Sequence, residues 1–257
     1  MRLLPRRLRP GEEATLVEHL GELRTRLVIS LLAVVVCFGF TYAFRLHLIH
    51  WLVQPLPEHK RKLVTLSPAE GFITSFMVSF YASFLISLPL ILWQIWSFLA
   101  PAFEEHTQRI VAGFTAFAAV LMAAGVLFGY FVALPAAVHF LTSYDSSVYT
   151  NNVRAKDYIS FTSLVLIACG VVFELPIFIL ALVRLRVLTT QKLRKNRRLG
   201  YFIIAAVAVA LPGVDPVTTT FEMIPLWVLY EASIWLAVFF DKRWKSAAAL
   251  REAALES

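Results

Sequence analysis

FITSFMVSFYASFLISLPLILWQIW, residues 72–96, is a run of 25 residues without a charged side chain. An α-helix rises about 1.5 Å per residue, so such a run extends about 37 Å, more than the roughly 30 Å hydrocarbon core of a bilayer. Helices on the surface of a soluble domain carry a polar face instead. The run therefore predicts a membrane-spanning helix.

The rest of the chain is also strongly apolar. Hydrophobic residues fill 59% and charged residues 16% of its 257 positions, against roughly 45–50% and 25% in soluble domains. Six apolar blocks cover residues 27–46, 72–96, 110–134, 158–182, 199–211 and 217–240. Five of them reach about 20 residues, the length that spans a bilayer. We predict an all-α membrane protein with six transmembrane helices, organised as one domain over residues 1–257.

The fifth block is shorter than the membrane is thick. Its 13 residues make a helix of roughly 20 Å. The turn sequence Pro-Gly-Val-Asp-Pro, residues 212–216, joins this block to the sixth, and it cannot lead far from the membrane surface. We expect short fifth and sixth helices that form a re-entering hairpin, beside thinned lipid or protein.

The distribution of lysine and arginine predicts the orientation, because basic flanks remain cytoplasmic. When alternate connections are grouped, one face holds 18 of the 24 Lys and Arg residues and the other holds six. The richer face includes both ends of the chain. We therefore predict cytoplasmic tails at residues 1–14 and 242–257, and we attribute the net charge of +7 to topology instead of nucleic-acid binding.

Residues 15–27 have the period of an amphipathic helix, with leucines on one stripe and Glu18, Glu22 and Arg26 on another. We expect this helix to lie along the cytoplasmic surface before the chain turns into the bilayer. One helical turn separates Glu22 from Arg26, so the two residues also fit an ordinary ion pair worth roughly 0.2–0.5 kcal/mol.

The connection APAFEEH, residues 100–106, places Glu104 and Glu105 on the face where the other connections are basic. Acidic residues barely affect membrane insertion, so the topology does not require them. They form either an ordinary solvated loop or, with Glu18 and Glu22, an acidic patch that receives a cationic ligand. Paired guanidinium groups suit such a patch, because they bond to carboxylates in a two-pronged fork.

Two further glutamates, Glu174 and Glu231, lie within apolar blocks. An ionisable residue at membrane depth is costly unless it faces protein or water. We expect a functional or structural polar role for Glu174. Glu231 either pairs with a polar neighbour or stays protonated.

The sequence contains no pattern typical of an enzyme. A zinc-binding His-Glu-x-x-His motif, a glycine-rich phosphate loop and a Gly-x-Ser-x-Gly elbow are all missing, and the six histidines are scattered. We predict a protein without enzymatic activity, metal or cofactor.

Several short motifs together resemble the TatC family, the multispanning receptors of the twin-arginine protein translocase. Each motif alone is weak, but they occur in the family's order over roughly residues 15–240. They are HLGELRTRL at residues 19–27, Pro55, WSFLAPA at 96–102 with Phe98 and Pro101, FELP at 173–176, Asp215, Pro225 and LYE at 229–231.

The resemblance implies a concave receptor-like bundle that binds Arg-Arg signal peptides of folded cargo proteins at its cytoplasmic face. It further implies assembly into a multimeric complex with small single-span subunits of the TatA or TatB type, in a bacterial or archaeal cytoplasmic membrane, and use of the proton-motive force. Two family glutamates meet the arginine pair. One corresponds to Glu22, followed by Leu23 and Arg24, and the other falls on Thr107.

Because Thr107 is not acidic, we predict that Glu105, or else Glu104, replaces the second glutamate through a small loop adjustment. The family's glutamine four residues after Asp215 is likewise replaced, here by Thr219. Two other classes of protein remain as alternatives. One is a secondary transporter with Glu174 as its proton-coupling carboxylate, although no internal repeat supports it, and the other is a membrane scaffold without its own ligand.

Overall fold

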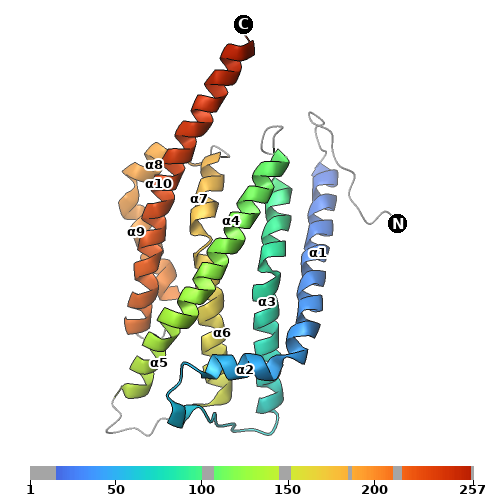
Figure 1. Ribbon diagram of the computed structural model, residues 1–257, viewed down its shortest axis with the longest axis vertical. Helices are drawn as coiled ribbons and strands as arrows, with labels where there is room; N and C mark the ends of the chain where they lie inside the picture. The colour runs from blue at the N-terminus through green and yellow to red at the C-terminus, as the bar shows by residue number, and fades with distance from the viewer. Residues whose placement is uncertain (1–15, 100–106, 145–151, 185–186, 211–215, 256–257) are drawn as a thin grey trace. The chain divides into compact units, whose positions relative to one another are not determined.

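The computed structural model of the chain describes residues 16–99, 107–144, 152–184, 187–210 and 216–255. These residues are almost entirely helical. The elements are α1 (Leu16–Ala43), α2 (Arg45–Val53), η1 (Glu58–Lys60), α3 (Glu70–Leu99), α4 (Thr107–Phe128), η3 (Gly129–Ala133), α5 (Leu134–Ser143), α6 (Ala155–Val172), α7 (Leu175–Arg184), α8 (Thr190–Lys195), α9 (Arg197–Ala210) and α10 (Pro216–Leu255) (Figure 1).

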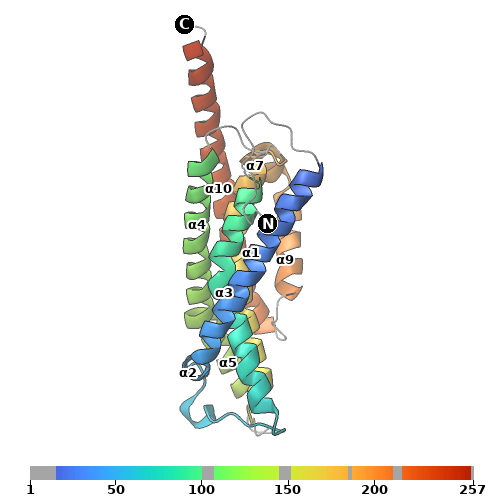
Figure 2. The same ribbon diagram turned by 90° about the vertical axis from the view of Figure 1, so that its right-hand side faces the viewer.

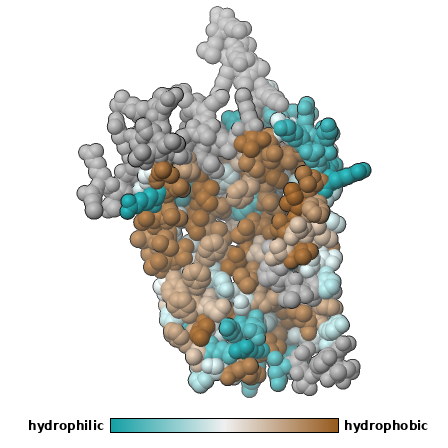
Figure 3. All heavy atoms as spheres, turned by 180° about the vertical axis from the view of Figure 1, so that it is seen from behind, coloured by the Kyte–Doolittle hydropathy of each residue, from teal (hydrophilic) through white to brown (hydrophobic). Residues whose placement is uncertain are grey.

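Five stretches of these helices are long and apolar enough to cross a membrane. They are Leu20–Ala43, Glu70–Phe98, Gly113–Ser143, Ala155–Arg184 and Thr219–Arg243. The 14-residue α9 corresponds to the short fifth block. Figure 3 shows hydrophobic side chains over much of the face in view that is not grey, as expected where lipid is the solvent. The prediction of an all-helical membrane protein is thereby confirmed.

The first helix differs from the prediction. We expected residues 15–27 to form a surface helix that turns before the membrane, but α1 continues as one helix from Leu16 to Ala43. Neither proline nor any other strong helix breaker lies between the amphipathic part and the apolar part, so the backbone bonds continue. Glu22 is therefore held at the end of a membrane helix, not on a separate surface segment.

The last helix also differs, because the predicted short sixth helix is wrong. Helix α10 has 40 residues and includes a candidate span of 25 residues, Thr219–Arg243. At about 1.5 Å per residue it is roughly 60 Å long, about twice the hydrocarbon thickness. The predicted tail at residues 242–257 is therefore helical as far as Leu255.

Two spans contain an interruption near a proline. The span Gly113–Ser143 changes from α4 into a π-helical turn, η3, just before Pro135, and α6 ends at Val172 just before Pro176 opens α7. Proline has no amide hydrogen and its ring clashes with the preceding turn, so a regular helix cannot pass through it unchanged. Prolines Pro89 and Pro225 lie inside α3 and α10.

The chain divides into two compact units. The first unit contains residues Met1–Val120 and Val138–Ile167, and the second contains Leu121–Ala137 and Ala168–Ser257. Within the first, α1 packs along α3, and both views show the two helices side by side (Figures 1 and 2). Within the second, α10 packs against α7, α8 and α9.

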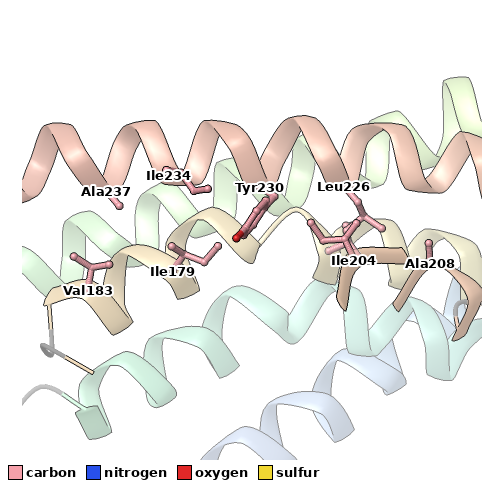
Figure 4. Packing of buried hydrophobic residues seen from close by; sticks show 9 residues of the cluster. Ile179, Val183, Ile204, Ala208, Leu226, Tyr230, Ile234 and Ala237 are labelled. Atoms are coloured by element: carbon pink, nitrogen blue, oxygen red, sulfur yellow. The ribbon is translucent and has the colours of Figure 1, made fainter. Parts of the chain in front are cut away.

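The core of the second unit is an apolar cluster between α7, α9 and α10 (Figure 4). Helix α7 contributes Ile179 and Val183, α9 contributes Ile204 and Ala208, and α10 contributes a row of side chains along one face. That row is Leu226, Tyr230, Ile234 and Ala237, spaced three or four residues apart. The short α9 is thus packed against protein on one side.

Gly200 allows α9 to approach α10 closely. A Cβ atom at this position would overlap the Tyr230 hydroxyl group and its ring.

We expect Gly200→Ala to lower the free energy of unfolding by roughly 1–3 kcal/mol through overpacking, measured by thermal unfolding of the purified protein in detergent. Tyr230→Phe should recover part of this loss in the double variant. Gly39→Ala is the matched control, because a Cβ atom there meets nothing within 4 Å, and a loss as large at Gly39 would contradict the explanation.

Candidate functional site

Glu22 and Arg26 form an ion pair near the start of α1. The Arg26 Nη2 atom lies 2.5 Å from Glu22 Oε1, and Arg26 Nε donates a hydrogen bond of 3.0 Å to the same oxygen. Both side chains are partly buried, with 19% of Arg26 and 16% of Glu22 exposed. The i,i+4 spacing places both residues on one face of the helix, as predicted from the sequence.

Arg26 also joins α1 to the end of α3. Its Nη1 group donates to Gln94 Oε1 at 3.2 Å, and its Nη2 group donates to the carbonyl oxygen of Ser97, also at 3.2 Å. The guanidinium group is therefore bonded on three sides: to Glu22, to an amide side chain and to a backbone carbonyl near the last turn of α3. Such a planar fork with fixed partners holds its orientation.

The second oxygen of Glu22 is left open by this arrangement. Both Arg26 bonds end on Oε1, and Oε2 accepts no hydrogen bond within the part of the chain that the structure describes. A carboxylate has about four acceptor positions on its two oxygens. The neighbouring Leu23 and Arg24 are exposed, with 45% of Leu23 accessible. The site therefore presents one directed acceptor atom, suited to a cationic donor from outside the chain.

The other residues predicted for this site are only partly described. Phe98, in the last turn of α3, is half-buried. Glu104, Glu105 and Pro101 lie outside the described residues. The proposed second carboxylate of the site therefore remains a prediction.

Glu174 lies in the break between α6 and α7, ten residues before the end of the span at Arg184. Only 2% of the residue is exposed, and neither carboxylate oxygen has a hydrogen-bond partner among the described residues of its unit. Its backbone carbonyl accepts bonds from the amides of Ile177 and Phe178, in the first turn of α7. The helix break thus places an unpaired carboxyl group inside a membrane span.

Glu231 has found polar partners on the short helix. Its Oε2 atom lies 3.3 Å from Arg197 Nη2, and its Oε1 atom accepts a hydrogen bond from the Tyr201 hydroxyl group. Arg197 and Tyr201 lie one turn apart on α9. We predicted that Glu231 either pairs with a polar neighbour or stays protonated, and the structure shows the pairing. These bonds join the start of α9 to α10.

An ion pair that the sequence did not predict, between a buried glutamate and a partly exposed arginine, lies where α3 and α6 begin. Glu70 is 2% exposed and accepts four hydrogen bonds, two from the Arg154 guanidinium at 3.0 and 3.3 Å and two from the amides of Leu66 and Lys156 at 2.9 and 3.3 Å. The hydrogen bond to Glu70 raises the pKa of Arg154 above its ordinary value. From the sequence alone, Arg154 counts only as a loop charge.

The same region is held by other bonds across the first unit. The Val64 amide donates to the Val153 carbonyl and the Ala155 amide donates to the Val64 carbonyl, both at 2.9 Å. The Tyr158 hydroxyl donates to the Leu52 carbonyl at 2.7 Å. These bonds fasten the connection between α2 and α3 to the start of α6.

The remaining predicted positions lie near helix ends. Pro55 is half-buried just after α2, and Thr219 is half-buried in the first turn of α10. Asp215 lies outside the described residues. Glu222, one turn after Thr219, is only 3% exposed, so α10 has a buried glutamate in addition to the half-buried Glu231.

A profile of the family described as Sec-independent protein translocase protein (TatC) matches residues 18–225 of the chain. The chain belongs to the TatC family. Related TatC proteins include one from Carboxydothermus hydrogenoformans, 33% identical over 230 residues, which are 89% of this chain and 95% of that protein. Another, from Aquifex aeolicus, is 34% identical over 235 residues, 90% of this chain and 97% of the relative.

The fold matches a crystal structure described as the twin-arginine translocase receptor TatC. The TM-score is 0.76 at 32% identity, over 86% of this chain and 98% of that one. A second structure of the receptor, in DDM, gives a TM-score of 0.77 at 32% identity, over 85% and 99%. This TatC protein is therefore a multi-pass membrane component of the Sec-independent, twin-arginine translocase. Of the three classes of protein considered from the sequence, translocase, transporter and scaffold, the translocase is the correct one.

The buried Glu70 is expected to be necessary for the fold of the first unit. Replacing it with alanine leaves the Arg154 charge and two backbone amides without their acceptor, so Glu70→Ala should lower the thermal midpoint in detergent and speed hydrogen exchange at the Val64 and Ala155 amides. Glu70→Gln, which keeps one acceptor oxygen at this position but removes the charge, should lower the midpoint less than Glu70→Ala. Glu58→Ala is the control, because its pairing with Arg61 is exposed. Equal effects at Glu58 and Glu70 would contradict this role.

Proposed function

We propose that this TatC protein binds the arginine pair of twin-arginine signal peptides through Glu22. The observation that carries the proposal is the open Oε2 atom of a partly buried carboxylate whose other oxygen is fixed by Arg26. A guanidinium group donates planar, directed hydrogen bonds to carboxylates, and such charge-assisted bonds are about twice as strong as neutral ones. Exposed Leu23 and Arg24 border the approach.

The second arginine of the signal meets the acidic connection in this proposal. Glu105, or else Glu104, supplies the carboxylate that the family pattern has at Thr107. Support comes from the sequence, where these two glutamates stand on an otherwise basic face. In the sequence they fall between Leu99, the last residue of α3, and Thr107, the first residue of α4, and Arg26 is bonded to the last turns of α3.

Within the membrane, we assign Glu174 to contact with an inserted segment of the signal or of a partner subunit. Its burial without a partner in its own unit supports this role, since such a carboxyl group is costly unless a ligand or water satisfies it. Small single-span subunits of the translocase are the proposed partners, with the proton-motive force as energy source. Both termini are proposed to be cytoplasmic, in a bacterial or archaeal plasma membrane.

Neutralising Glu22 should remove much of the affinity for twin-arginine peptides. Loss of a hydrogen bond to a charged group costs roughly 1.5–3 kcal/mol, which weakens binding about 10-fold to 100-fold. We therefore expect Glu22→Gln to weaken binding of a fluorescent Arg-Arg signal peptide by this factor, measured by fluorescence anisotropy with purified protein in nanodiscs. A matched Lys-Lys peptide should bind the wild-type protein more weakly and lose less in the variant.

Glu58→Gln serves as the control, since Glu58 is an exposed carboxylate outside the proposed site. Equal binding of the Arg-Arg and Lys-Lys peptides to the wild-type protein would remove the receptor proposal. Glu104→Gln and Glu105→Gln, tested one at a time, assign the second contact.

We expect transport to require that α9 is short. A helix of 14 residues is too short for an unperturbed bilayer, and we propose that it thins the membrane locally and so eases passage of a folded cargo. Exchanging residues 199–211 for a 20-residue apolar helix should abolish export of a twin-arginine reporter in cells. A length-preserving variant with substitutions only at exposed positions such as Phe202 and Val209 should retain export. Export by the lengthened protein would remove this idea.

A further inference from the structure

The carboxylate proposed to receive the signal already carries a guanidinium group of its own chain. Two nitrogen atoms of Arg26 donate hydrogen bonds to Oε1 of Glu22. The same guanidinium group also donates to Gln94 and to the carbonyl of Ser97. We propose that Arg26 is the residue that makes Glu22 select arginine over lysine. The inference rests on the proposed function of Glu22 and names a positioning residue that acts through it.

The first part of the mechanism is charge. Glu22 and Arg26 together are electrically neutral, so a cation that approaches Oε2 is attracted by the carboxylate and repelled by the guanidinium beside it. A lysine ammonium group is a compact and strongly hydrated charge. It gains little from a neutral pair, and that gain is offset by the loss of its hydration. The pair therefore provides a poor site for lysine.

The second part is geometry. An incoming arginine spreads its charge over a planar group, is more weakly hydrated, and donates along fixed directions. With Oε1 occupied, the remaining acceptor positions of Glu22 are on Oε2, whose direction Arg26 holds through its two bonds to Oε1. The fixed N–H groups of an incoming arginine form better hydrogen bonds when the orientation of the acceptor oxygen is also fixed. The freely rotating lysine ammonium group gains nothing from that fixed orientation. The internal pair thus penalises lysine more than arginine.

The third part is the anchoring of Arg26. A flexible arginine would move away when a second cation arrives, and the penalty would disappear. Here the Nη1 group is held by Gln94 at 3.2 Å and the Nη2 group by the Ser97 carbonyl at 3.2 Å, and only 19% of the side chain is exposed. Both anchors belong to α3, against which α1 packs, so the charge of Arg26 stays beside Glu22.

The test compares two peptides on three variants of the full-length protein in nanodiscs. The peptides are a fluorescent twin-arginine signal peptide and its Lys-Lys version. We expect Arg26→Gln to raise the affinity for the Lys-Lys peptide by roughly tenfold, as for removal of one nearby repelling charge in a partly exposed site. Affinity for the Arg-Arg peptide should change less, so the ratio between the two peptides falls. A general loss of structure would weaken both peptides alike and leave their ratio unchanged.

Two further variants refine the result. Gln94→Leu keeps the charge of Arg26 but removes one of its anchors, and it should lower the Arg-Arg to Lys-Lys ratio by a smaller factor than Arg26→Gln. This variant also tests the inference if Arg26→Gln does not fold. Arg198→Gln, which removes one exposed positive charge from α9, controls for net charge and should leave the ratio as in the wild-type protein.

The outcomes separate the inference from the proposed function. If the wild-type protein prefers the Arg-Arg peptide through Glu22 and the ratio is unchanged in both Arg26→Gln and Gln94→Leu, the inference about Arg26 is overturned and the receptor function stands. If the wild-type protein has no preference, the proposed function itself fails. A lower ratio in Arg198→Gln as well would also overturn the inference, since any loss of positive charge would then suffice.

Discussion

The structure depends on the absence of hydrogen-bond partners in the hydrocarbon core of a bilayer. Backbone groups meet this constraint by forming helices, and charged side chains meet it by pairing within the protein. Three carboxylates of the described helices each meet an arginine on another turn or another element. The pairs are Glu22 with Arg26, Glu70 with Arg154 and Glu231 with Arg197. The last two pairs join two elements, and Arg26 of the first is bonded to α3, so the constraint shapes the tertiary structure.

Glu174 stands apart from these pairs. It lies in the short break between α6 and α7, two residues before Pro176, and neither of its carboxylate oxygens has a hydrogen-bond partner among the described residues. Burying a carboxyl group without a hydrogen-bond partner costs free energy, so stability alone gives little reason to place one here. The contrast supports a role in contact with something that is not always present, such as an inserted polypeptide segment.

The sequence predicted the helices well because hydrophobic length is set by membrane thickness, a constraint external to the chain. It also predicted the Glu22–Arg26 pair, whose spacing is local. It did not predict that α1 is continuous, because an amphipathic pattern indicates a helix but not where the helix turns. The partners Glu70 and Arg154 are 84 residues apart, and Gln94 lies within the uncharged apolar run of residues 72–96. No local pattern predicts such long-range contacts.

The Glu22 site has one more consequence, which concerns synthesis. Its described parts all lie between residues 22 and 97, on α1 and α3. Among the five candidate spans of the described residues, these two are synthesised first, and they pack directly against each other. The internal arginine can therefore occupy its carboxylate as soon as this first hairpin has inserted, while the remaining helices are still being made. A nascent protein would then never present Glu22 as a bare charge to the basic segments of other chains.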